Sequence, residues 1–115
     1  RAVTFGDGFS GGNVPFDRVA PLVHELRVAA ERAGRDPSRL QVVCRGTVLP
    51  CESPQGPGRR PLFGSIEEIR QDVGRYAELG LTELFLEANV GLHGWPVERT
   101  LEIMAALAPG RPLAA

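Results

Sequence analysis

Strand-like and helix-like patterns of apolar residues alternate three times along the chain. Short runs rich in β-branched and aromatic residues predict strands over residues 2–9, 40–49 and 82–90. Apolar residues at spacings of three and four predict helices over residues 15–34, 66–80 and from 96 onward. Three consecutive strand–helix units predict an α/β fold whose parallel strands are joined by right-handed crossovers.

Side-chain alternation along the second and third strands separates two faces. In the second strand, the set that we expect to pack against helices consists of Val42, Cys44, Gly46 and Val48. Arg45 and Thr47 then face the other side, as do Phe85, Glu87 and Asn89 in the third strand. The favoured interpretation of Arg45 and Glu87 is an ion pair that keeps interior charges satisfied. The alternative is a pair that orients a bound ligand.

A long loop, residues 50–64, separates the second strand from the next helix and is rich in Pro and Gly. Arg59 and Arg60 in this loop could bind an anionic substrate or a cofactor phosphate. Because the sequence predicts no support for either side chain, we favour a mobile loop without a catalytic duty. Ser65 and Glu68 form a capping box, which predicts that the helix begins at about residue 66.

Composition narrows the function classes. The 115 residues suit one domain, and the net charge of -1 argues against a nucleic-acid or anionic-membrane partner. All 13 basic residues are arginine, which excludes lysine Schiff-base chemistry. Cys44 and Cys51 fit no metal motif and are expected to be reduced thiols, and no metal site is expected. With no apolar run long enough to span a membrane, a cytoplasmic protein is expected.

Three segments carry a resemblance to a known family: "RAVTFGDGF", "RVAAERAGRDPSRLQVV" and "FGSIEEIRQDVGRYAELGLTELFLE". In this order and spacing they resemble the bacterial luciferase-like monooxygenase family, over nearly the whole chain. The resemblance implies a single partial-barrel domain, residues 1–115, similar to the C-terminal three units of a (β/α)8 TIM-type barrel. Since the sequence starts at Arg1 without a methionine, we expect it to be processed or part of a longer protein.

The resemblance also implies a function, namely one wall of the pocket of a flavin- or deazaflavin-dependent oxidoreductase or monooxygenase. Reduced FMN or a deazaflavin coenzyme would be the cofactor, with a small molecule as substrate. The family segment that helps to hold the cofactor phosphate would precede Arg1. Three strands cannot close a barrel, so the partner would be a second copy or a missing N-terminal half. The alternative is a non-catalytic, self-associating barrel fragment, which leaves catalysis by this chain alone open.

Further pocket candidates lie near the expected strand ends. Phe9 stands where the family usually has Trp, and Asp7 could point inward, although a turn between two glycines is the favoured interpretation. His93 follows the third strand, on the expected catalytic face. It is a candidate general acid, although a solvated loop histidine is the favoured interpretation.

Overall fold

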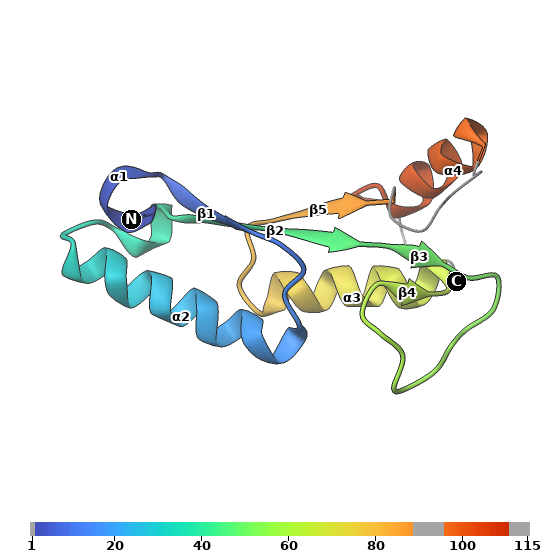
Figure 1. The fold of residues 1–115 in the computed structure, drawn as a ribbon, viewed down its shortest axis with the longest axis horizontal. Helices are drawn as coiled ribbons and strands as arrows, with labels where there is room; N and C mark the ends of the chain where they lie inside the picture. The colour runs from blue at the N-terminus through green and yellow to red at the C-terminus, as the bar shows by residue number, and fades with distance from the viewer. Residues whose placement is uncertain (1, 89–95, 111–115) are drawn as a thin grey trace. The chain divides into compact units, whose positions relative to one another are not determined.

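The computed structural model of the chain describes residues 2–88 and 96–110. These residues form two compact units. The first contains residues 2–46 and 75–85, and the second contains residues 47–74, 86–88 and 96–110. Helices alternate with strands along the chain (Figure 1), which confirms the predicted α/β class.

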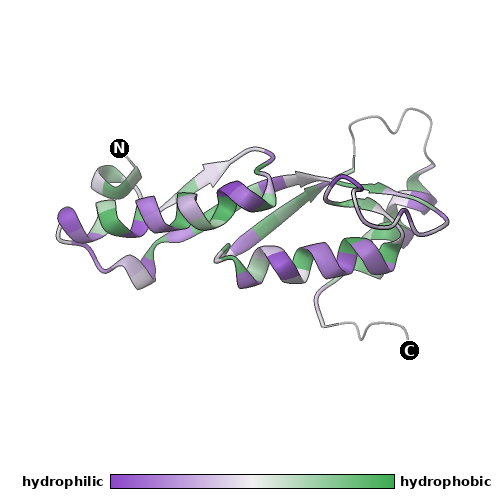
Figure 2. Cartoon of the chain, turned by 90° about the horizontal axis from the view of Figure 1, so that it is seen from below, coloured by the Kyte–Doolittle hydropathy of each residue, from purple (hydrophilic) through white to green (hydrophobic). Residues whose placement is uncertain are grey.

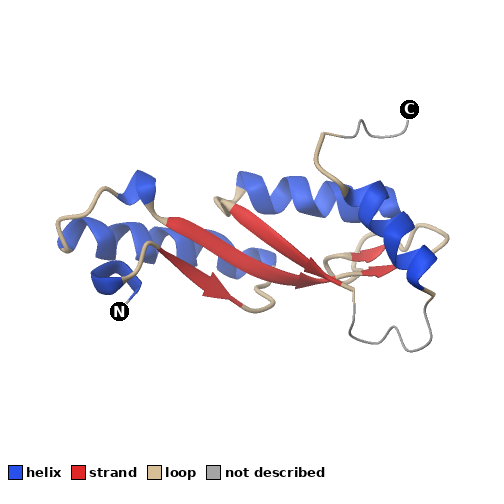
Figure 3. Ribbon diagram, turned by 90° about the horizontal axis from the view of Figure 1, so that it is seen from above, coloured by secondary structure: helices blue, strands red, loops and turns tan. Residues whose placement is uncertain are grey.

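Three strands form one sheet, in the order β1-β2-β5. They are β1 (Gly8–Gly11), β2 (Gln41–Thr47) and β5 (Glu83–Glu87). β1 pairs with β2 in parallel, with Phe9 opposite Val42 and Ser10 opposite Val43. The arrow of β5 runs in the same direction as those of the other two strands (Figure 3). The prediction of parallel strands is therefore confirmed.

The first predicted strand, residues 2–9, is wrong over residues 2–7. Residues Ala2–Phe5 form a short helix, α1, and the strand β1 begins only at Gly8. The guanidinium of Arg35 donates hydrogen bonds to the carbonyls of Val3 and Gly6, at the end of this helix. Carbonyls at a helix end need such donors, and this one comes from about thirty residues further along the chain. The local pattern of apolar residues could not predict it.

Helix α2 (Phe16–Arg32) starts and stops where the sequence predicts. It follows Pro15, and Gly34 closes it with a φ of +74°, the left-handed conformation that glycine adopts readily. Its residues Val19, Val23 and Ala30 are buried. Apolar and polar residues alternate in bands along the helices (Figure 2), as expected for helices with one buried face. The 3-10 helix η1 (Pro37–Arg39) then leads into β2.

The predicted strand over residues 40–49 is two strands. β2 ends at Thr47, and a separate strand, β3 (Leu49–Pro50), pairs in parallel with β4 (Phe63–Gly64). The Val48 N–H donates to the carbonyl of Glu87 in β5 at 2.9 Å, whereas the Leu49 N–H donates to the carbonyl of Leu62 at 3.0 Å. The backbone therefore changes its hydrogen-bonding partner after residue 48.

Helix α3 (Ile66–Glu78) begins at the predicted capping box. The Ser65 hydroxyl accepts from the Glu68 N–H at 3.2 Å, and the Glu68 carboxylate accepts from the Ser65 N–H at 2.9 Å. Ile69 is fully buried in the second unit, while Tyr76 packs on Phe16 of α2 in the first. The last helix, α4 (Val97–Leu107), begins after Pro96 as predicted.

Candidate functional site

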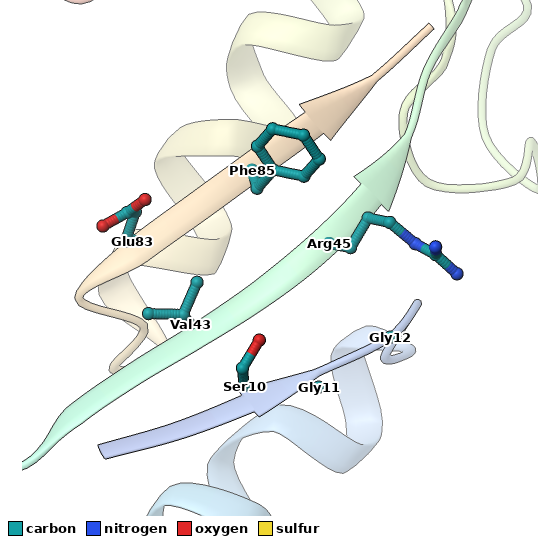
Figure 4. Close-up of a pocket in the computed structure, with 7 residues that line it drawn as sticks. All are labelled: Ser10, Gly11, Gly12, Val43, Arg45, Glu83 and Phe85. Atoms are coloured by element: carbon teal, nitrogen blue, oxygen red, sulfur yellow. The ribbon is translucent and has the colours of Figure 1, made fainter. Parts of the chain in front are cut away.

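A hollow of about 450 Å³ lies on one face of the sheet in the first unit. All three strands or the turns beside them contribute to its lining, which consists of Ser10, Gly11, Gly12, Val43, Arg45, Glu83 and Phe85. In Figure 4 the side chains of Arg45 and Phe85 stand on the near face of the strands, and the ribbon of α2 lies behind β1. The size is within the range of small-molecule sites.

This face is open because β2 buries only one side. Val42, Cys44 and Gly46 are buried, whereas Val43 is half-buried and Arg45 is exposed. The predicted separation of the two faces is therefore confirmed for this strand. In β5 the ring of Phe85 is 58% exposed, a large apolar group accessible at the hollow. A charge and an exposed ring on adjacent strands make this face the strongest candidate site.

The other residues predicted for this face fall in two groups. Thr47 and Glu87, at the ends of β2 and β5, are half-buried and belong to the second unit. Strand alternation gives them the same facing as Arg45 and Phe85. The Arg45–Glu87 ion pair stays a prediction. Asn89 and His93 lie outside the described residues.

Asp7 and Phe9 are not at the hollow. Because α1 takes up residues 2–5, Asp7 precedes β1 and lies at the amino end of that strand, away from the carboxyl ends that form barrel sites. Its carboxylate is fully exposed, 3.5 Å from the guanidinium of Arg35. Phe9 pairs with Val42 and alternates with Ser10, so it lies on the helix-facing side of β1. Both residues are therefore removed from the set of pocket candidates.

Arg59 has the fixed support that the sequence did not reveal. Its guanidinium donates to both carboxylate oxygens of Asp72, at 2.6 and 2.9 Å, and its Nε lies 3.0 Å from the Glu68 carboxylate. The side chains of Arg59 and Asp72 are only 15% and 8% exposed. Hydrogen bonding to Asp72 raises the pKa of Arg59. Two carboxylates of the chain pair with this cation, which argues against the alternative in which Arg59 binds an external anion.

Glu68 and Asp72 also fix the backbone of the loop. The Glu68 carboxylate accepts from the N–H groups of Gln55 and Gly56, and Asp72 accepts from the buried N–H of Leu62 at 2.7 Å. We call Arg59, Glu68 and Asp72 the loop clamp. Its bonds to three loop amides give the loop a support that the sequence did not predict.

Backbone hydrogen bonds determine the charge of the clamp at low pH. The N–H groups of Ser65, Gln55 and Gly56 lower the pKa of Glu68 from its ordinary value of 4.5 to about 2, against partial burial. The Glu68 carboxylate therefore stays charged in acidic solution in which an ordinary glutamate would be protonated.

Arg60 differs from its neighbour. It is exposed, and its guanidinium lies over the Phe63 ring at 5.0 Å from the centroid. This contact is a cation–π interaction at the surface. It leaves the role of Arg60 in ligand binding a prediction.

Sequence reasoning missed two parts of the site. Asp72 lies on the buried stripe of α3, three residues after Ile69 and four before Tyr76, and an acidic residue at such a position signals a buried partner. Glu83 lies two residues before Phe85 in β5, so it could have been placed on the same open face. Ser10, Gly11 and Gly12 follow from the "SGG" turn only once the true start of β1 is known.

No family model matches the chain, and no curated protein sequence matches it. Within residues 2–88 and 96–110, no group of three or more His, Cys, Asp or Glu side chains is arranged to hold a metal ion. Over the same residues, no helix has the length and apolar character needed to cross a membrane. A functional assignment therefore depends on residues of the chain itself.

Proposed function

We propose that this chain is part of a luciferase-like, flavin- or deazaflavin-dependent oxidoreductase or monooxygenase that acts in the cytoplasm. In this proposal it supplies one wall of the cofactor and substrate pocket. The observation that carries the proposal is the one-sided burial of β2, with Cys44 buried and Arg45 exposed at a hollow. In a TIM-type barrel, helices cover the outer face of the sheet and the other face lines the interior. Free thiols at Cys44 and Cys51 suit a reducing compartment.

The residues at the hollow fit one side of a flavin-type pocket. Phe85 offers a ring for stacking, and Arg45 offers a charge that can orient a polar group. The bound cofactor would supply the redox chemistry, while this chain would contribute orientation and exclusion of water. The remaining strands would come from a second copy or from an N-terminal half, because three strands cannot close a barrel.

A titration of the 115-residue chain with FMN, and separately with the deazaflavin coenzyme, tests this proposal. Cofactor fluorescence reports binding, and light scattering gives the molar mass of the sample. We expect saturable binding of one cofactor by an assembly larger than a monomer. Saturation should weaken in Arg45→Gln and not in Arg27→Gln, a matched change on α2. Absence of saturable binding at any molar mass would contradict the chain's contribution to a flavin pocket.

A second candidate function, a self-associating module without catalysis, is favoured by the surface of α4. Val97, Leu101 and Met104 are exposed and follow one another at spacings of four and three residues. Such spacing places them on one side of the helix, where a second copy could cover them. The variant Leu101→Glu should then be monomeric. A wild-type chain that is monomeric at high concentration would exclude this candidate.

A further inference from the structure

The two ends of the hollow on the open face carry opposite charges. Glu83 and Phe85 lie on β5, while Arg45 extends from β2 toward Gly12, away from Glu83 (Figure 4). The carboxylate and the guanidinium therefore lie toward opposite ends of the hollow. An anionic group of a ligand is attracted to the Arg45 end and repelled from the Glu83 end.

Arg45 can hold such an anion. It takes part in an interaction within the chain, but a guanidinium carries five N–H donors in a planar fork. A carboxylate matches two of these donors with parallel, charge-assisted hydrogen bonds.

The apolar part of the lining favours a ring. Phe85 is 58% exposed and the half-buried Val43 lines the same hollow, so a flat apolar group can stack on the Phe85 ring. β1 and β5 flank the central strand β2, so they lie about 10 Å apart, two strand spacings. This span suits one ring with a short anionic substituent.

Gly12 leaves the Arg45 end of the hollow open. A Cβ atom added there would meet no other atom within 4 Å, so the space above this residue is empty. An alanine at this position meets no other atom and would reduce the open space at this part of the lining. This gives a test that does not depend on charge.

We propose that the hollow binds an aromatic carboxylate, with the carboxylate on Arg45 and the ring on Phe85. The assignment names a substrate class for the proposed oxidoreductase and rests on that function for its reaction. Binding of the carboxylate itself needs only the hollow, so it can be measured in the absence of any flavin.

The test is a titration of the ¹⁵N-labelled 115-residue chain with sodium benzoate, followed by amide chemical shifts. We expect saturable shifts at Gly11, Gly12, Arg45 and Phe85. Cyclohexanecarboxylate keeps the charge without the aromatic ring, and benzyl alcohol keeps the ring without the charge. Both should bind more weakly than benzoate.

Variants of the chain separate the contributions of charge and of open space to benzoate binding. Arg45→Gln should weaken benzoate binding by about tenfold, whereas Arg27→Gln on α2 should leave it unchanged. Gly12→Ala should weaken it by several-fold, whereas Gly74→Ala on α3, where an added Cβ also meets nothing within 4 Å, should have no effect. Glu83→Gln should leave binding equal or tighter, because it removes a like charge.

The proposal is overturned if benzoate causes no saturable shift at the hollow, or if Arg45→Gln binds it as well as the wild type does. Equal binding of cyclohexanecarboxylate would overturn the preference for a ring. Benzoate binding without any flavin binding would support the hollow while contradicting the proposed oxidoreductase. Flavin binding without benzoate binding would leave the proposed function standing and remove this substrate class.

Discussion

Arg59 and Arg45 have the same side chain in very different surroundings. Arg59 follows β3, is 15% exposed, and is held by Asp72 and Glu68 of the loop clamp. Arg45 is exposed on β2 and lines a hollow beside the accessible ring of Phe85. Two carboxylates of the chain pair with Arg59, whereas Arg45 lies at a surface with room for a ligand.

The difference shows why the position of a charge along the sequence is weak evidence for binding. Both arginines lie on or after strands of an α/β fold, where binding residues are common. What separates them is exposure: Arg59 is largely removed from water beside two carboxylates, whereas Arg45 is exposed at the hollow. Removing one partner of a largely buried cation leaves an uncompensated charge, so the fold depends on keeping all members of the loop clamp.

Breaking the loop clamp at Asp72 should have the largest effect. Asp72→Ala removes the partner of a buried guanidinium and the acceptor of the Leu62 N–H, so we expect a loss of about 3 kcal/mol in the free energy of unfolding. Urea unfolding measures it. Asp72→Asn should lose less, because its amide oxygen can still accept from Leu62. Glu31→Ala, an exposed change on α2, is the control; a loss as small as in this control would contradict the clamp.

Acid should weaken the clamp through Glu68. Its pKa in the folded chain is about 2, below the ordinary value of 4.5, so its carboxylate stabilises the fold fully above about pH 4.5. That contribution is lost as the pH falls toward 2. The stability difference between the wild type and Glu68→Gln should therefore narrow over this range in urea unfolding. A constant difference for Glu68→Gln over this range would refute the assignment.

Local patterns predicted the parts of the fold that depend on neighbouring residues. The capping box of Ser65 and Glu68 and the alternation along β2 involve positions within a few residues of each other. Each follows from rules of helix ends and strand pleats. These two features gave the start of α3 and the open face that carries Arg45.

Contacts between distant positions could not be predicted in this way. Arg35 closes α1 from about thirty residues along the chain, which moved the start of β1 and displaced Asp7 and Phe9 from the expected site. Arg59 pairs with Asp72, thirteen residues later, and this contact gives the loop a support that the sequence did not predict. Both outcomes depend on which donors tertiary packing brings to buried acceptors.

The most direct test of this comparison is the free energy of unfolding of three arginine-to-glutamine variants, measured side by side in urea. Arg59→Gln leaves Asp72 buried without its cation, and we expect a loss of about 2 kcal/mol. Arg60→Gln, at an exposed position, should change stability by no more than about 0.5 kcal/mol, and Arg45→Gln should lose less stability than Arg59→Gln because Arg45 is exposed. Equal losses in Arg59→Gln and Arg45→Gln, or a larger loss in Arg45→Gln, would contradict the division between a structural and a ligand-facing arginine.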